Sequence, residues 1–178
     1  MRSNMIFNPF TRLAGWSALL IGVVGLSLTV ALSYLTGTHF FGLLMVGFAK
    51  NSPLWVYAVE LVAHWLVMSA VAYVTGLVLS KVRIRAIDVL GTILMSKLPL
   101  LILPLIRLIQ PFQSFSFLSF QMFFLVIIYL TLLVYICILI YNALSVSFNL
   151  KGKRLVIAYI SSLVLTEIAV LYLNLVLI

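Results

Sequence analysis

The chain has 178 residues, of which 65% are hydrophobic and only 8% are charged, against roughly 25% charged in an ordinary soluble domain. So few polar residues cannot coat a water-soluble globule. The net charge of +8 does not indicate nucleic-acid binding, because the basic residues stand in small groups at the ends of apolar runs. The composition therefore predicts an integral membrane protein whose main partner is the lipid bilayer.

The first apolar run, at 16–35, contains no charged residue and follows Arg2 and Arg12. A signal peptide opens in the same way, and Ala31 and Ser33 would suit a cleavage site after the run. The run is nevertheless longer than the usual signal-peptide core of roughly 7 to 15 residues. We therefore favour an uncleaved first membrane span.

A short segment, 1–15, precedes this span and is expected to lie in the cytoplasm. Asn8-Pro9 is typical of a helix start, because proline suits the first helical position. Phe10 and Leu13 could then lie among the lipid headgroups. A short interfacial helix is expected in this segment.

The second and third spans are expected at 54–79 and 87–109. The third contains Pro99 and Pro104, and a proline inside a helix removes a backbone hydrogen bond and collides with the preceding turn. The third helix is therefore expected to be kinked or broken at these prolines.

The last two spans are expected at 120–146 and 155–178, after a turn at 110–119 that is rich in phenylalanine and serine. No internal repeat and no soluble domain are visible between the apolar runs. The sequence therefore predicts an all-α fold, a bundle of five transmembrane helices that forms a single transmembrane domain over 1–178.

Basic residues near the span ends predict the orientation of the bundle. The N-terminal segment and the loops after the second and fourth spans carry most of the lysine and arginine. Basic loops are retained in the cytoplasm, so the N-terminus is expected inside and the C-terminus outside. The two cytoplasmic basic loops are defined by Lys81, Arg83, Arg85, Lys151, Lys153 and Arg154.

Four ionisable residues within the apolar spans form a candidate intramembrane polar cluster: Glu60, His64, Lys97 and Glu167. Glu60 and His64 are four residues apart and share a helix face. A charged group in a membrane is costly, so these residues could line a path for a proton, an ion or a substrate. Alternatively, Lys97 pairs with Glu60 or Glu167 and only holds helices together. We prefer the structural interpretation.

No pattern in the chain indicates catalysis. A G-x-S-x-G motif is absent, and the spacing of Glu60 and His64 is not that of a zinc protease. We therefore predict no catalytic residue, no cofactor and no metal site. Ser69, Ala72 and Gly76 instead place small residues along one side of the second span, which permits close helix approach within the bundle or between subunits.

Two short motifs resemble the YIP1 family of five-span membrane proteins, in particular its short bacterial members. The motifs are the segment NPFTRL at 8–13 and the segment IDVLG at 87–91, which leads through 97–99 into the third span. The resemblance implies a cytoplasmic N-terminus and a C-terminus across the membrane, and it suggests a bacterial inner or plasma membrane. Eukaryotic members are associated with vesicle traffic and Rab GTPases, but this chain lacks their long N-terminal region. For the short bacterial members the resemblance implies an unsettled function and supplies no catalytic residues.

Two functional hypotheses follow from the sequence. The leading hypothesis is a noncatalytic protein, not an enzyme, that organises membrane components or binds a membrane-protein partner, which includes a second copy of itself. The alternative is a small transporter or channel subunit that uses the candidate intramembrane polar cluster. An intramembrane enzyme is the third and least favoured hypothesis.

Overall fold

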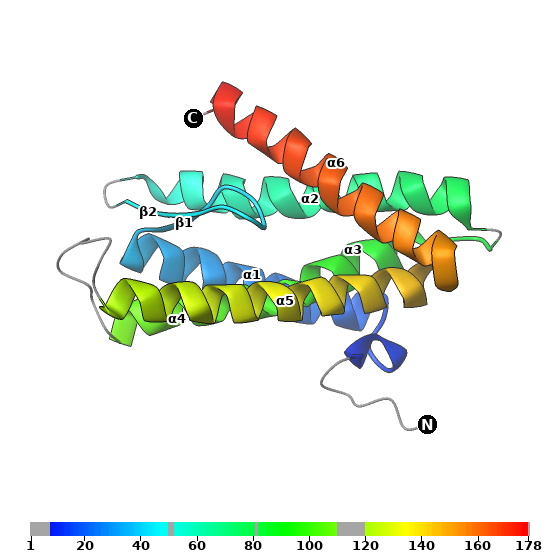
Figure 1. Cartoon of the computed structure of the whole chain (residues 1–178), viewed down its shortest axis with the longest axis horizontal. Helices are drawn as coiled ribbons and strands as arrows, with labels where there is room; N and C mark the ends of the chain where they lie inside the picture. The colour runs from blue at the N-terminus through cyan, green and yellow to red at the C-terminus, as the bar shows by residue number, and fades with distance from the viewer. Residues whose placement is uncertain (1–7, 50–51, 81, 110–119, 178) are drawn as a thin grey trace.

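The fold is a bundle of membrane-length helices, as the apolar runs predict. The computed structural model describes residues 8–49, 52–80, 82–109 and 120–177. Five of its helical segments are long and apolar enough to cross a membrane, which confirms the all-α, five-span fold. The uninterrupted spans are α1 (Trp16–Thr36), α2 (Leu54–Leu79), α5 (Phe120–Phe148) and α6 (Gly152–Leu177). Figure 1 shows α1 to α5 aligned along the long axis and α6 inclined across them.

The third span is divided into three pieces, as its prolines predict. Helix α3 (Ala86–Ser96) is followed by the 3-10 turn η2 (Leu98–Leu101) and then by α4 (Ile102–Ile109). Pro99 has no N–H to continue the ladder of α3, so the chain tightens into η2 at this residue. Pro104 lies in the first turn of α4, where a missing N–H is tolerated.

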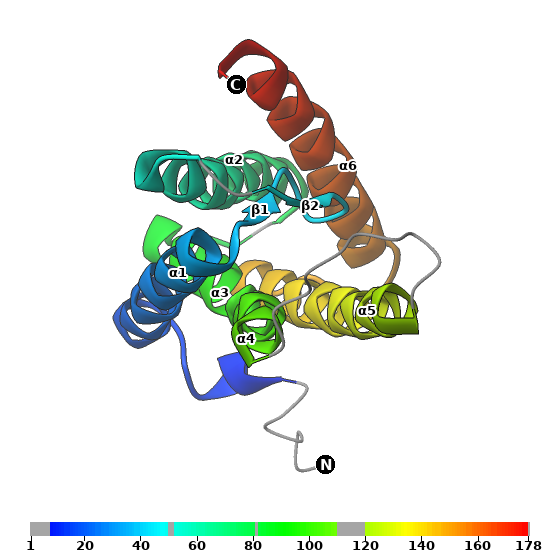
Figure 2. The ribbon, with the colours of Figure 1, turned by 90° about the vertical axis from the view of Figure 1, so that its left-hand side faces the viewer.

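An antiparallel β-hairpin follows α1, in a stretch where the sequence predicted only a break between spans. Strand β1 (Thr38–Phe40) pairs with β2 (Val46–Phe48), with His39 opposite Gly47. Gly37 adopts a φ of +66°, a left-handed conformation that lets the chain fold back from the end of α1. Figures 1 and 2 show the hairpin beside α2, on the side that faces the other helices.

Small residues bring α1 and α3 into close contact along a line that we call the α1–α3 seam. A Cβ atom added to Gly91 would lie 2.6 Å from the carbonyl oxygen of Gly15 and 2.8 Å from the amide nitrogen of Leu19. A Cβ atom on Gly22 would lie 2.7 Å from Cγ of Leu94. The two helices can therefore pack backbone to backbone only because these positions are glycine.

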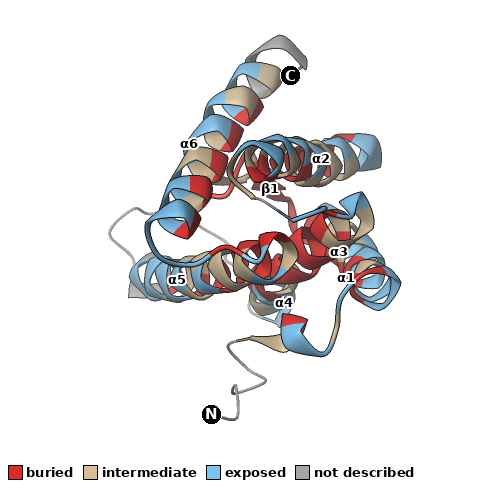
Figure 3. Ribbon diagram, turned by 90° about the vertical axis from the view of Figure 1, so that its right-hand side faces the viewer, coloured by how far each residue is buried: buried red, intermediate tan, exposed pale blue. Residues whose placement is uncertain are grey.

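The small residues of α2 are also used inside the bundle. Ser69, Ala72 and Gly76 are all buried, and a Cβ atom on Gly76 would lie 2.6 Å from the ring of Phe148 in α5. Of the two alternatives that the sequence left open, the structure places this stripe within the bundle. Figure 3 shows buried residues gathered where the helices face one another and exposed residues on the outer surface.

From residue 8 onwards, the N-terminal segment forms less helix than the sequence predicted. Residues Pro9–Thr11 make a single 3-10 turn, η1, in place of an interfacial helix. Phe10 is 1% exposed and packs in a buried cluster with Met95 of α3 and with Leu139 and Ala143 of α5. Phe10 therefore holds the segment against the bundle through protein contacts.

Candidate functional site

Glu60 of α2 is fully engaged at the base of the hairpin. Its Oε1 atom lies 2.8 Å from Nδ1 of His39, and its Oε2 atom accepts a hydrogen bond of 3.1 Å from the backbone N–H of Phe40. The side chain is only 1% exposed. His39 in turn approaches Ser52 with its other ring nitrogen, at 3.3 Å. Both carboxylate oxygens of Glu60 are thus used to hold β1 against α2.

Glu167 of α6 is engaged in the same way at the tip of the hairpin. Its Oε1 atom accepts a hydrogen bond of 2.9 Å from the N–H of Leu43, and its Oε2 atom accepts one of 3.2 Å from the N–H of Leu44. His64 of α2 places Nε2 at 3.4 Å from the same Oε1 atom. A Cβ atom on Gly42 would lie 2.7 Å from Oε2, so this approach requires glycine at the tip.

Arg107 of α4 binds the start of the hairpin from the third span. Its guanidinium donates to the carbonyl oxygen of Gly37 at 3.2 Å and to the hydroxyl oxygen of Thr38 at 3.3 Å. The guanidinium carbon also lies 4.4 Å from the ring centroid of Phe48 on β2. This combination of charge-assisted hydrogen bonds and a cation–π contact fixes both strands.

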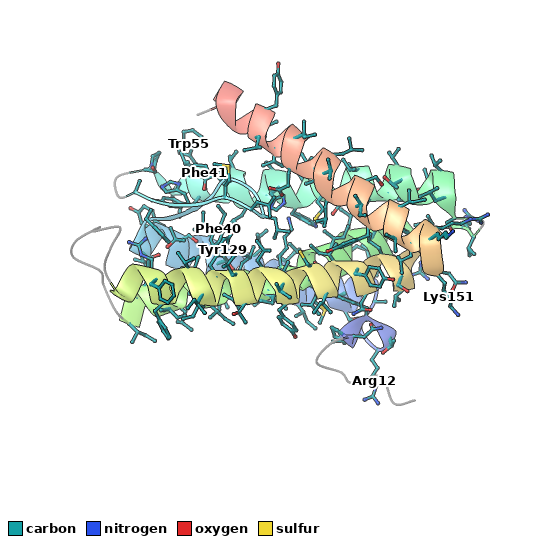
Figure 4. The ribbon with its side chains drawn as sticks, viewed as in Figure 1. Arg12, Phe40, Phe41, Trp55, Tyr129 and Lys151 are labelled. Carbon is teal, nitrogen blue, oxygen red and sulfur yellow. The ribbon has the colours of Figure 1, made fainter. Side chains whose placement is uncertain are left out.

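Tyr129 of α5 completes the contacts of the tip. Its hydroxyl donates a hydrogen bond of 2.6 Å to the carbonyl oxygen of Leu43, so the tip is bound through both its N–H and its C=O groups. Phe40 belongs to the central buried cluster, against which Tyr129 packs. Figure 4 shows Phe40 on the hairpin and Tyr129 on α5.

The hairpin is therefore a re-entrant element held by three charged side chains, Glu60, Arg107 and Glu167, which we call the hairpin clamp. Glu167 lies about ten residues before the end of α6, which corresponds to about 15 Å along the helix or half of a bilayer core of roughly 30 Å. Non-helical backbone at this depth needs internal hydrogen-bond partners, since lipid offers none. The clamp provides these partners.

Lys97 occupies the break in the third span and differs from the other buried charges. It is 5% exposed, and among the described residues its Nζ atom has no hydrogen-bond partner. Its charge interacts electrostatically with Glu167 and His64. It also lines a small cavity between α1, α2, α3 and η2, which is barely large enough to admit one water molecule.

The four residues of the candidate intramembrane polar cluster are brought together only in part. His64 and Glu167 are in direct contact, and Lys97 lies within electrostatic range of both. Glu60 instead pairs with His39, and neither glutamate makes a direct ion pair with Lys97 among the described residues. The expected pairing of Lys97 with Glu60 or Glu167 is therefore not seen as a direct contact.

Sequence reasoning did not identify His39 and Arg107 as site residues. Arg107 stands near the end of an apolar run, where it resembled an ordinary interfacial charge, yet it is only 7% exposed. His39 lies between apolar runs in a segment with no helical pattern. The glycines at 37, 42 and 47 were the available signal, because glycine is favoured where the chain turns tightly or where another group approaches its backbone closely.

The basic residues gather at the end of the bundle opposite the hairpin base. Arg83, Arg85, Lys153 and Arg154 are exposed there, and Lys81 lies outside the described residues. Arg85 makes an ion pair of 3.4 Å with Asp88 in the first turn of α3. Figure 4 shows Arg12 and Lys151 at this same end, which we call the basic end.

Comparison with known proteins supplies no relative for this chain: no family model, no curated protein and no solved structure matches it. The resemblance to the YIP1 family therefore stays a prediction. Within the described residues, no three histidine, cysteine, aspartate or glutamate side chains form a group that could hold a metal ion. The site is thus defined by its geometry, which is a set of charged side chains arranged around a re-entrant hairpin.

Proposed function

We propose that the protein is a noncatalytic integral membrane protein that binds or organises other membrane components. The observation that supports this function is the use of the two buried glutamates: all four carboxylate oxygens face a partner in the hairpin or a histidine. Groups that are committed to holding the fold are poorly placed to carry a solute through it. The charges then stabilise a shaped, lipid-embedded element, the hairpin, that a partner can contact.

The orientation and family assignments belong to the same proposal. The basic end faces the cytoplasm of a bacterial inner or plasma membrane, as the distribution of lysine and arginine favours. The N-terminus is then inside and the C-terminus outside, which is also what the YIP1 resemblance implies. A reporter that is active only in the cytoplasm should be inactive after Ile178 and active after Asn149. Activity after Ile178 would reverse the orientation.

Photo-crosslinking in native membranes tests the binding role. A photoreactive amino acid is placed, one position at a time, at exposed apolar sites on the hairpin and the helices, such as Leu44, Val74, Leu130 and Ile168. A partner or a second copy of the chain should give one discrete protein adduct from neighbouring positions and only lipid adducts elsewhere. Lipid adducts at every position would overturn the proposed binding role.

A transporter or channel subunit is the second candidate, and the state of Lys97 favours it. A buried amine without a described hydrogen-bond partner, beside the break of a span and within range of Glu167, is typical of a site that exchanges ligands. Purified protein in liposomes distinguishes the two candidates. The leading proposal expects no proton or ion flux above that of protein-free liposomes. Flux that Lys97→Met abolishes without loss of thermal stability would establish transport instead.

A further inference from the structure

The tip of the hairpin is held by a group that can take up a proton. The strands have only three residues each, and an isolated two-stranded hairpin is marginally stable. Across the tip, a backbone hydrogen bond of 3.1 Å runs from the N–H of Phe41 to the carbonyl oxygen of Met45. Its other backbone groups bond to Glu167 and Tyr129, while the Leu43 side chain is buried in the central core cluster and the Phe41 ring stacks on His39. The docked tip therefore depends on side chains of α5 and α6.

Protonation of Glu167 would change these contacts directly. An ionised carboxylate has two acceptor oxygens, and both accept from tip amides here, from Leu43 and from Leu44. A protonated carboxyl group carries an O–H donor on one oxygen, which is then the poorer acceptor. On Oε2 that donor faces the N–H of Leu44, and on Oε1 it can turn to Nε2 of His64, which leaves the N–H of Leu43 with the weakened acceptor. The close fit of Gly42 against Oε2 leaves little space for the group to turn away. One amide of the tip would lose its partner.

The groups that face Glu167 come from every helix packed around it. His64 approaches from α2, the charge of Lys97 acts from the junction of α3 and η2, and the hydroxyl of Tyr129 faces the tip from α5. A charged histidine or lysine favours the ionised form of Glu167 and so keeps the tip docked. Release therefore requires proton uptake by Glu167 itself, and its side chain is 12% exposed.

The tip has a direction in which to move. Leu44 is 60% exposed and Met45 is 48% exposed, so the apolar end of the hairpin already faces the lipid side of the bundle. The base of the hairpin stays bound to Glu60 and Arg107, which are separate from Glu167. Loss of the Glu167 contacts would thus loosen the exposed end of the tip at Leu44 and Met45, while Tyr129 and the buried Leu43 side chain still hold its inner side.

We propose that Glu167 is a proton-binding site that sets the position of the hairpin tip. The ionised carboxylate docks the tip between α5 and α6, and protonation lets its exposed end, Leu44 and Met45, move towards lipid. The inference goes beyond the proposed binding role, because it adds a proton-controlled change in the surface that a membrane partner meets.

Spin-label distances in nanodiscs test this proposal on the full chain. Cys137→Ala removes the native thiol, and labels are attached at Leu44→Cys on the tip and Leu130→Cys on α5, which are both exposed. A label pair at Leu130→Cys and Val164→Cys, between α5 and α6, is the control. We expect one narrow tip distance at pH 8 and a second, broader population on acidification to about pH 3, below the ordinary range of a glutamate carboxyl group, because the neighbouring charges favour the ionised form. The control pair should not change.

Two variants make the experiment specific for Glu167. Glu167→Gln mimics the protonated group, so the tip should already be released at pH 8 and insensitive to acidification. Lys97→Met removes a charge that favours the ionised carboxylate, so the transition should move to higher pH. A wild-type tip that stays docked throughout the titration would overturn the proposal. A transition that persists unchanged in a folded Glu167→Gln protein would also overturn it, because another group would then control the tip.

Discussion

The two halves of the bundle are held together by different physical means. Towards the basic end, α1 and α3 meet along a seam of small residues, where Gly91 allows backbone contact with Gly15. Towards the hairpin end, charged side chains bind the polar backbone of a hairpin that the lipid could not satisfy. Van der Waals packing is available to any pair of apolar helices that carry small residues, whereas the hairpin clamp exists only because non-helical backbone enters the membrane.

This difference indicates which half is specialised. A seam of glycines stabilises a bundle at little cost, because no charge is removed from water. Three buried charges are costly unless each is fully paired, so a fold that contains them has kept the hairpin in spite of that cost. We infer that the hairpin half carries the function and that the seam half provides the scaffold.

Removal of Glu60 should produce the largest loss of stability. Glu60→Ala leaves His39 and the N–H of Phe40 without their partner in a buried site, which is expected to cost about 3–5 kcal/mol. Unfolding in mixed micelles with increasing dodecyl sulfate measures the change. Glu60→Gln is the matched control, because it keeps an acceptor oxygen and should cost less. Equal stability of Glu60→Ala and wild type would remove Glu60 from the clamp.

A bulky residue in the seam should have the next largest effect. Gly91→Leu forces a side chain against the backbone of Gly15 and Leu19, which cannot move without separating the helices, and should cost about 2–3 kcal/mol. The same unfolding assay applies. Ala31→Leu adds a similar side chain on an exposed face of α1 and should be nearly neutral. Similar effects of both substitutions would mean that α1 and α3 do not make this close contact.

Loss of the arginine contact should be weaker and confined to the hairpin half. Arg107→Met removes the donors to Gly37 and Thr38 and the contact with Phe48, at a cost of about 2 kcal/mol. Arg107→Lys keeps the charge but not the planar group, so it should recover only part of the loss. Protease susceptibility of the 37–49 segment in nanodiscs should rise in Arg107→Met. A full recovery of stability by lysine would show that charge alone is required.

The smallest loss of stability is expected for removal of the α5 tyrosine hydroxyl that contacts the hairpin tip. Tyr129→Phe removes one hydroxyl that donates to Leu43 and should cost about 1 kcal/mol or less, the usual size of a hydrogen bond between membrane segments. Tyr141→Phe, on the same helix, serves as the comparison, since its ring packs against Tyr159 of α6 and, among the described residues, its hydroxyl makes no hydrogen bond to the hairpin. A larger loss for Tyr141→Phe than for Tyr129→Phe would contradict the assigned contact.

The membrane spans could be predicted from the sequence because the bilayer imposes a length and an apolar composition that local residues express directly. The break near Pro99 was predictable for the same reason, since proline lacks an N–H wherever it stands. The hairpin was not, because strands of three residues have no periodic pattern long enough to distinguish them from a loop.

The charged residues of the candidate site could be predicted from the sequence, but the groups that they bind could not. Glu60 and Glu167 stand out in the sequence as charged residues within apolar runs, because a charged side chain in a membrane span is costly and therefore rare. The partners of these two glutamates are mostly backbone amides, which every residue type except proline carries, so the sequence does not mark them. Those of Glu167 lie 124 and 123 residues away along the chain. Tertiary packing alone brings these groups together, so the sequence could indicate the charges but not what they hold.

Amide hydrogen exchange at the hairpin tip tests the central claim most directly, namely that a buried carboxylate binds the tip of a re-entrant hairpin. In nanodiscs at neutral pH, the N–H groups of Leu43 and Leu44 should exchange slowly, and Glu167→Ala should accelerate them at least tenfold while the helix amides of α2 stay protected. Exchange of both amides at the rate of an exposed loop in the wild-type protein would contradict the account.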